Sequence, residues 1–120
     1  MDENENQLSF EVKEVEKGYV VLSIIGDLVM WSLQDAKEEV QKLISQNKVK
    51  LVLDLSRTNY IDSSGLGFFI GTLKKLKNAG GDLLLINLNT YIYGIFQLIH
   101  LQDIIDIYND FEEASQNFKD

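Results

Sequence analysis

The sequence predicts an α/β fold in which helices cover a mixed, mostly parallel sheet. Extended apolar segments alternate along the chain with segments whose apolar residues repeat every three to four positions. Such alternation is typical of parallel strands joined by crossover helices, and two extended segments at the beginning add an antiparallel pair. The expected order is strand, strand, helix, strand, helix, strand, helix, strand, helix, which makes about five strands and about four helices.

The length is consistent with one domain. The chain has 120 residues, of which 45% are hydrophobic, enough to fill a single core. No repeat, linker or low-complexity segment divides it. We therefore expect a single domain over residues 1–120, with a flexible N-terminus over residues 1–6.

Two strands and a helix are predicted for the first part of the chain. Residues 8–13 alternate between apolar and polar side chains, as a half-buried edge strand does. Residues 19–25 are apolar on both faces, which favours a central strand, and a turn over residues 16–18 would join the two as a hairpin. Residues 33–44 place their apolar side chains on one helical stripe, with Ser32 as the expected N-cap.

The middle of the chain predicts a buried strand followed by a helix. Residues 50–55 are too uniformly apolar for a surface helix. Residues 66–76 form a second apolar helical stripe, and the helix is expected to end near Ala79. Gly67 and Gly71 lie in this helix, which predicts that its backbone comes close to another element.

The last part repeats the pattern on a smaller scale. Residues 82–87 predict a third buried strand, and Thr90 is expected to cap a short helix. Residues 104–108 predict a last strand. Asp110 with Glu113 resembles a capping box at the start of a final helix.

The composition favours a protein that binds other proteins. The chain has 19 acidic and 11 basic residues, a net charge of −8, and such a surface repels nucleic acid and anionic membranes. A partner with basic residues around its docking site is expected, with binding that weakens in salt. The chain has no cysteine, and its acids and single histidine form no metal-binding pattern. We expect no cofactor and no metal.

The same features predict where the protein acts. No apolar run reaches the roughly 18 residues that a membrane span requires. The first six residues are polar and acidic, and the absence of cysteine fits a reducing compartment. We expect a soluble cytoplasmic protein that is a monomer when free.

Residues 60–67, which follow the strand over residues 50–55, are the main candidate for a functional site. Asp62, Ser63 and Ser64 lie where the next helix begins, so their side chains are candidates for capping and for modification. Free N–H groups and the helix dipole at such a position tolerate a phosphoserine, which carries a charge of roughly −1.5 to −2. By itself, however, a Ser-Ser-Gly at a helix start is most often only a cap.

Four segments together are similar to a known family. They are Val52-Leu53-Asp54-Leu55-Ser56, then Ile61-Asp62-Ser63-Ser64-Gly65-Leu66-Gly67, then Gly80-Gly81-Asp82-Leu83, and Ile95-Phe96-Gln97-Leu98 with Leu101 ahead of Ile104. From about Val12 to Phe118 the chain closely resembles the bacterial anti-sigma factor antagonists, which are single STAS-domain proteins. The most specific part is Asp-Ser-Ser-Gly-Leu-Gly after a hydrophobic strand.

The resemblance implies a STAS-like fold and a phosphorylation switch. In that family, the serine directly after the aspartate is phosphorylated by a partner that is both anti-sigma factor and serine kinase, and a serine phosphatase removes the phosphate. By position the acceptor is Ser63, and Asp62, Ser64 and Gly65 form the switch surface. The unphosphorylated form would dock on the anti-sigma factor and release a sigma factor, whereas the phosphorylated form would not dock.

One segment departs from the family pattern. Members commonly have Gly-Glu/Asp-Leu/Ile-Asp after the second strand, with the last acid near the kinase contact, whereas residues 26–29 here read Gly-Asp-Leu-Val. Asp27 remains a candidate contact, but Val29 replaces the last acid. Met30 and Trp31 follow, so this edge is expected to be more apolar and to suit a different partner or a different kinase. A contact role for Trp31 competes with a structural one, in which it packs over the first helix.

Other readings of the chain lead to different functions. A response-regulator receiver would use Asp54 as its phosphoacceptor, but Asp27 is a poor candidate for its metal-binding acid and no lysine follows the last strand. A serine hydrolase would need a Gly-x-Ser-x-Gly elbow and a base, and the only histidine, His100, lies in an apolar setting typical of a packed or surface residue. A STAS module of another signalling or stress complex and Ser64 as the acceptor stay open.

Overall fold

The computed structural model describes residues 7–120, and the predicted flexible N-terminus over residues 1–6 lies outside them. The order of strands and α-helices agrees with the prediction. The elements are β1 (Ser9–Glu14), β2 (Tyr19–Ile25), α1 (Leu33–Ser45), β3 (Lys50–Arg57), α2 (Ser63–Asn78), β4 (Asp82–Ile86), α3 (Thr90–Leu98), β5 (Asp106–Tyr108) and α4 (Phe111–Ser115), with short 3-10 helices η2 (Glu16–Gly18) and η3 (Leu101–Asp103). No helix within the described part of the chain is long and apolar enough to cross a membrane.

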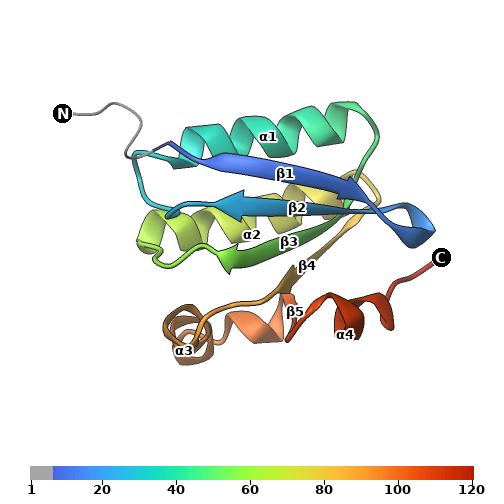
Figure 1. Ribbon diagram of the computed structural model, residues 1–120. Helices are drawn as coiled ribbons and strands as arrows, with labels where there is room; N and C mark the ends of the chain where they lie inside the picture. Colours follow the sequence, from blue (N-terminus) through green and yellow to red (C-terminus); the bar gives the residue numbers. More distant parts are fainter. Residues whose placement is uncertain (1–6) are drawn as a thin grey trace.

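The strands form one mixed sheet of five strands in the order β1-β2-β3-β4-β5. β1 pairs with β2 antiparallel, and the other three pairs are parallel. The predicted hairpin and the predicted edge position of the first strand are therefore confirmed. Figure 1 shows that the connections after β2, β3 and β4 lie at the same end of the sheet.

Alternation along the strands divides the buried residues between the two faces of the sheet. One face packs against α1, α2 and α3 and holds the larger core, to which β3 contributes Leu51, Leu53 and Leu55. The opposite face holds a smaller cluster covered by α4 and the residues after it, where the Tyr19 and Phe118 rings stack with centroids 3.9 Å apart. Among residues 7–120, no helix covers the larger part of that face, beyond α4 (Figure 1).

The caps of two helices differ from the prediction, one in the residue that caps the helix and the other in the bonds that the capping residue makes. Asn89, not Thr90, caps α3, since its side chain accepts the Ile92 N–H at 2.8 Å. Ser32 precedes α1 as predicted, but its hydroxyl donates to the Asp27 carbonyl at 2.6 Å in the preceding turn and makes no capping bond.

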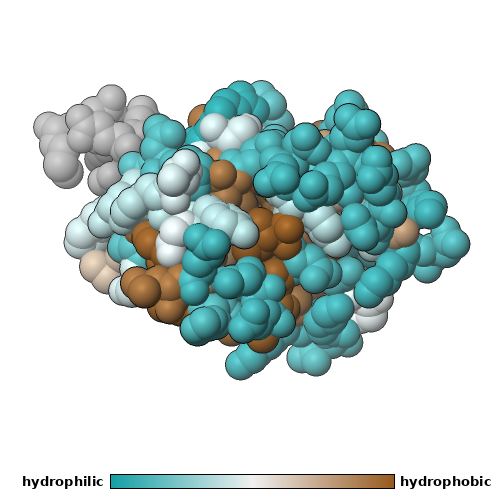
Figure 2. Space-filling model, turned by 90° about the horizontal axis from the view of Figure 1, so that it is seen from below, coloured by the Kyte–Doolittle hydropathy of each residue, from teal (hydrophilic) through white to brown (hydrophobic). Residues whose placement is uncertain are grey.

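The apolar stripes of two elements are also less buried than predicted. Val12 is 44% exposed, because β1 has a neighbouring strand on one side only. Ile99 lies beyond the end of α3 and is exposed, together with Leu98 and Ile104. Figure 2 shows apolar residues gathering on the lower side of the molecule, over α3 and the turn that follows it.

The connection between α2 and β4 is tightly packed at Gly81. A Cβ atom added there would overlap the backbone of Val49, whose carbonyl accepts the Asp82 N–H at 3.0 Å. Gly81→Ala is therefore expected to lower the free energy of unfolding by about 1–3 kcal/mol, measured by urea unfolding.

Gly94→Ala is the matched control for this prediction. A Cβ at Gly94 in α3 meets no atom within 4 Å, so alanine should stabilise the helix by up to about 1 kcal/mol. If Gly81→Ala has the same free energy of unfolding as wild type, the connection between α2 and β4 is not closely packed at this residue.

Candidate functional site

The connections after β2 and β3 run side by side and meet at Asp62. An isolated bridge pairs Leu28 with Ile61, and the Leu28 N–H donates to the Tyr60 carbonyl at 3.1 Å. The Asp62 carboxylate caps α2, because Oδ1 accepts the Gly65 N–H at 3.1 Å. Its other oxygen, Oδ2, accepts the Met30 N–H at 3.0 Å. One carboxylate therefore fixes both the start of α2 and the turn before α1.

The two serines of this turn differ in their surroundings. Ser63 is the first residue of α2 and is exposed to solvent. Ser64 is half-buried and lines a groove between α1 and α2. The capping bond is made by Asp62, so the Ser63 hydroxyl is not needed to start the helix. A kinase would reach Ser63 more easily than Ser64.

Gly65 is required by the close approach of the two connections. A Cβ atom at this position would lie 2.7 Å from the Leu28 carbonyl oxygen and 3.3 Å from the Ile61 Cβ. Any side chain would push the turn before α1 away from α2. The structure thus gives a packing reason for a glycine that the sequence singled out only by resemblance.

The turn before α1 presents an acid and two large apolar side chains to solvent. Asp27 is exposed, Val29 is half-buried, and Met30 and Trp31 are 58% and 69% exposed. The structural reading of Trp31, in which it packs over the first helix, was therefore wrong. Ser32 holds the turn from inside, because its hydroxyl accepts the Val29 N–H at 3.1 Å. The side chains of Met30 and Trp31, which lie between these two residues, project into solvent.

A pair of stacked tyrosines next to the turn was missed in the sequence. Tyr60 and Tyr91 are 47% and 48% exposed, and their rings stack with centroids 5.6 Å apart. Burial against its neighbours and, to a smaller extent, the interaction with Tyr60 raise the pKa of Tyr91 above its usual value. The two residues lie 31 positions apart, and no periodicity links them. The sequence showed only that Tyr60 lies directly before the serine turn.

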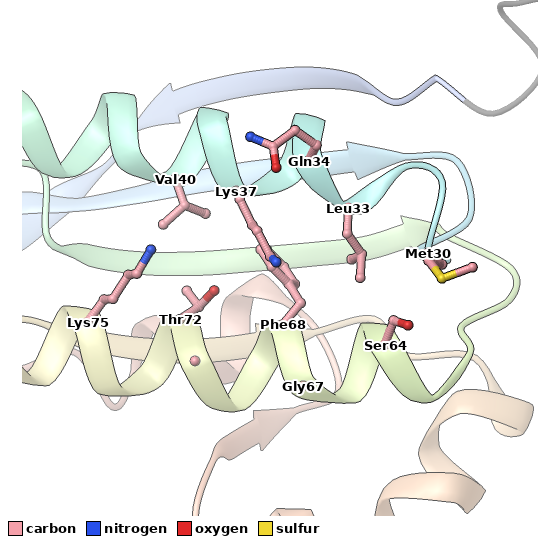
Figure 3. Close-up of a pocket in the computed structure, with 11 residues that line it drawn as sticks. Met30, Leu33, Gln34, Lys37, Val40, Ser64, Gly67, Phe68, Thr72 and Lys75 are labelled. Carbon is pink, nitrogen blue, oxygen red and sulfur yellow. The ribbon is translucent and has the colours of Figure 1, made fainter.

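A groove of about 550 Å³ runs between α1 and α2, as Figure 3 shows. Leu33, Val40 and Phe68 form its apolar base, while Lys37 and Lys75 extend over it from opposite walls. Ser64 and Met30 close the end nearest the serine turn. The groove is open to solvent, since Lys37, Lys75 and Met30 are exposed.

Two of the three glycines of α2, Gly67 and Gly71, line this groove. A Cβ added to Gly67 or to Gly71 would meet no atom within 4 Å. The prediction that these glycines let α2 approach another element of the fold was therefore wrong. Each costs about 1 kcal/mol of helix stability relative to alanine, with no packing in the described residues that requires it.

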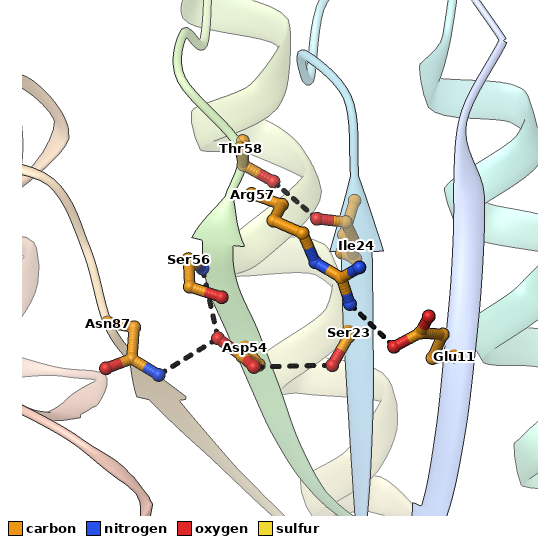
Figure 4. Close-up of polar contacts among 8 residues, drawn as sticks. All are labelled: Glu11, Ser23, Ile24, Asp54, Ser56, Arg57, Thr58 and Asn87. Atoms are coloured by element: carbon orange, nitrogen blue, oxygen red, sulfur yellow. Dashed lines mark hydrogen bonds and ion pairs between the residues drawn. The ribbon is translucent and has the colours of Figure 1, made fainter.

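On the opposite face of the sheet, Asp54 is the centre of a polar network (Figure 4). Its Oδ1 accepts the Asn87 Nδ2–H and the Ser56 N–H, both at 3.0 Å, and its Oδ2 accepts the Ser23 hydroxyl at 3.3 Å. Burial alone would raise the pKa of the Asp54 carboxyl group. The hydrogen bonds from Asn87, Ser56 and Ser23 outweigh burial and lower that pKa below its usual value. The network joins β2, β3 and the end of β4.

Comparison with known proteins identifies the family. A sequence model of the STAS domain matches residues 11–114. The chain belongs to the STAS domain family. The anti-sigma-B factor antagonist of Bacillus subtilis is 35% identical over 100 residues, which cover 83% of this chain and 90% of that protein. The anti-sigma-B factor antagonist of Listeria monocytogenes is 29% identical over 110 residues, covering 92% and 96% of the two chains.

A solved structure has the same fold. The crystal structure of an anti-sigma factor antagonist from Mycobacterium paratuberculosis superimposes with a TM-score of 0.83, at 20% identity, over 94% of this chain and 95% of that one. At this identity the likeness bears on the fold alone. It supports the five-stranded mixed sheet and the four helices of this STAS protein.

Among the residues that it describes, the structure does not bring together those that a serine hydrolase or a metal site would need in this STAS protein. The sequence predicted that His100 is either packed or on the surface, and in the structure it is exposed. Its Nδ1 lies 3.7 Å from the Asp103 carboxylate. The atoms around the start of α2 come from the turns at Leu28 and Ile61, and His100 is not among the contacts found there. Within residues 7–120, no three potential metal ligands lie close enough together to hold an ion.

The Asp54 network predicts a specific pH dependence. Because its pKa is lowered in the folded state, the charged carboxylate contributes stability above the unfolded pKa of about 4, and this contribution is lost as the pH falls through the lower folded pKa. Asp54→Asn should therefore lower the melting temperature at pH 7 and lower it less at pH 3. A difference from wild type that is the same at both pH values would contradict this account.

Proposed function

We propose that this STAS protein is an anti-sigma factor antagonist whose binding is switched by phosphorylation of Ser63. The observation that carries the proposal is the geometry of the serine turn, where an exposed hydroxyl lies at the start of α2 beside an aspartate that is already engaged in capping. The names of the relatives from Bacillus subtilis and Listeria monocytogenes support the same function.

The local structure would tolerate a phosphate on Ser63. The first N–H groups of α2 and the positive end of its dipole lie next to the hydroxyl, and both favour an anion. Asp62 and Gly65 fix the turn through backbone contacts that do not involve the Ser63 side chain. The fold would therefore stay intact when Ser63 is modified.

The same phosphate would block a docked partner. A partner surface that accepts a neutral hydroxyl beside Asp62 would face an additional charge of roughly −1.5 to −2 and a bulky hydrated group. Burying that charge without a matching cation is costly. Binding would be lost while the fold is kept, as a switch requires. Asp62, Ser64, Gly65, Asp27 and Trp31 make up the docking surface in this proposal.

The proposal implies a simple circuit. The unphosphorylated protein docks on an anti-sigma factor, which then releases its sigma factor. That anti-sigma factor is also the serine kinase that modifies Ser63, and a serine phosphatase reverses the modification. The protein itself catalyses nothing, is a monomer when free, and works in the cytoplasm on protein partners, without nucleic acid, membrane or cofactor.

The central test is a comparison of Ser63→Ala with Ser63→Asp in the source organism. Tagged full chains are purified from its cells, and the retained anti-sigma factor is identified and quantified. We expect Ser63→Ala to retain it as wild type does, and Ser63→Asp to retain at least about tenfold less, because a fixed negative charge opposes docking. Equal retention by both variants would falsify the switch.

Mapping the phosphorylated residue separates the two serines. The retained kinase and ATP are incubated with wild type, Ser63→Ala and Ser64→Ala, and tryptic peptides are analysed by mass spectrometry. We expect phosphate on Ser63 in wild type and Ser64→Ala, and none in Ser63→Ala. Phosphate on Ser64 instead of Ser63 in the wild-type protein would show that the acceptor is Ser64 and that the proposed assignment is wrong.

A third prediction concerns the exposed tryptophan, Trp31. Trp31→Ala should weaken binding of the anti-sigma factor by about tenfold, because large aromatic side chains dominate binding energy at interfaces. Its melting temperature should stay close to that of wild type, since 69% of Trp31 is exposed. Leu98→Ala, which removes a side chain that is 79% exposed on α3, is the control and should bind normally. If Trp31→Ala binds the anti-sigma factor as tightly as wild type does, Trp31 is not part of the docking surface.

A further inference from the structure

Two glycines of α2, Gly67 and Gly71, make no contact among the described residues that requires a glycine. Gly67 and Gly71 lie four positions apart in the helix, both line the groove between α1 and α2, and a methyl group on either would reach no other atom within 4 Å. Gly65, two positions earlier, shows the contrast, because there a methyl group would meet the Leu28 carbonyl. The open backbone at Gly67 and Gly71 is what a close-packed partner would need.

The charges on the groove walls indicate the chemistry of that partner. Lys37 on α1 and Lys75 on α2 extend over the groove from opposite sides (Figure 3). Neither forms a salt bridge with any residue between 7 and 120, whereas Lys77, two positions after Lys75 in α2, pairs with Asp82 at 3.0 Å. The chain as a whole has a net charge of −8, so this groove is a local basic site on an acidic protein.

The shape of the groove suits a helix. Along α2 its lining extends from Ser64 to Lys75, which corresponds to about 16 Å, or three helical turns, at 1.5 Å per residue. Leu33, Val40 and Phe68 offer an apolar base, as in grooves that accept the apolar face of an amphipathic helix. A drug-sized ligand is usually enclosed over most of its surface, whereas this groove is open along one side, with Gly67 and both lysines exposed.

We propose that an amphipathic helix of the anti-sigma factor, carrying acidic residues, packs into the groove between α1 and α2 and lies closely against Gly67 and Gly71. This inference rests on the proposed function for the identity of the partner. Ser64 and Met30 close one end of the groove, so a helix seated there would continue the surface around Ser63. The partner would place acids toward Lys37 and Lys75, and basic residues toward Asp27 and Asp62.

The first test fills the groove. The anti-sigma factor recovered with the tagged Ser63→Ala chain is purified, and its affinity for full-length variants is measured by isothermal titration calorimetry. Gly71→Ala and the larger Gly71→Leu are expected to bind at least about tenfold and a hundredfold more weakly. The melting temperature of Gly71→Ala should rise by about 4 °C, because alanine favours the helix. A loss of binding with a gain in stability excludes misfolding as the cause.

Gly94 provides the matched control, because it is a helical glycine in α3 where a Cβ also meets nothing within 4 Å. Gly94→Ala and Gly94→Leu should bind as wild type does. If the Gly71 variants bind as tightly as the Gly94 variants, the groove is not occupied and the proposal is wrong.

The second test reverses the charges. Lys37→Glu combined with Lys75→Glu should weaken binding by more than about tenfold, because both lysines would face acids of the partner. Lys42→Glu combined with Lys74→Glu changes the net charge equally on the same two helices but outside the groove lining, so binding should be close to that of wild type. Equal losses in both pairs would show only a net-charge effect and would overturn the proposal.

Amide NMR signals locate the contact directly. On addition of the anti-sigma factor, the signals of Gly67 and Gly71 should shift or broaden, and that of Gly94 should not. If ATP alone shifts the signals of these two glycines, the groove binds a small molecule, and the proposal that it binds a helix is wrong.

The tests distinguish this inference from the proposed function. If Ser63→Asp abolishes binding but the groove variants do not, the switch stands and this inference fails. If Ser63→Asp binds normally while the groove variants bind weakly, only the switch fails.

Discussion

The two bonds of the Asp62 carboxylate organise the functional end of this STAS protein. One oxygen caps α2 through the Gly65 N–H, and the other holds the Met30 N–H of the turn before α1. The contact is possible only because Gly65 has no side chain where the Leu28 carbonyl passes. One charged acceptor thus ties together two connections that are more than thirty residues apart in the sequence. Such charge-assisted bonds to backbone N–H groups are among the stronger hydrogen bonds in proteins.

In this turn, one residue has the structural role and its neighbour has the proposed regulatory role. Asp62 supplies the cap, so the neighbouring hydroxyl of Ser63 is free to react. The side chains of Met30 and Trp31 project from the adjoining turn, which is held from inside by Ser32. A modification at Ser63 can therefore alter the surface offered to a partner without disturbing the bonds that keep the turn in place.

Much of the fold could be predicted because it rests on local patterns. The alternation of apolar segments predicted the order of strands and helices, and the uniformly apolar run over residues 50–55 predicted a buried strand. In the structure this strand, β3, lies at the centre of the sheet. The predictions that failed concerned single side chains. The capping role went to Asn89 instead of Thr90, and Trp31 faces solvent instead of α1. Asn89 and Thr90 were both locally suitable caps, and Asn89 is also held by a tertiary bond in which its Nδ2–H donates to the Asn59 carbonyl at 3.0 Å. Periodicity alone does not determine whether the Trp31 side chain, in the turn before α1, packs or faces solvent.

The sequence by itself determined the element order, the serine turn at the start of α2 and the acidic character of the surface, because periodicity, helix capping and charge are local or additive properties. Only the tertiary structure decided that Asp62 joins two turns, that Tyr60 stacks on Tyr91, and that two glycines and two lysines face one groove. These features depend on which segments the parallel sheet brings side by side. Their residues are far apart in the chain, so no local pattern records them.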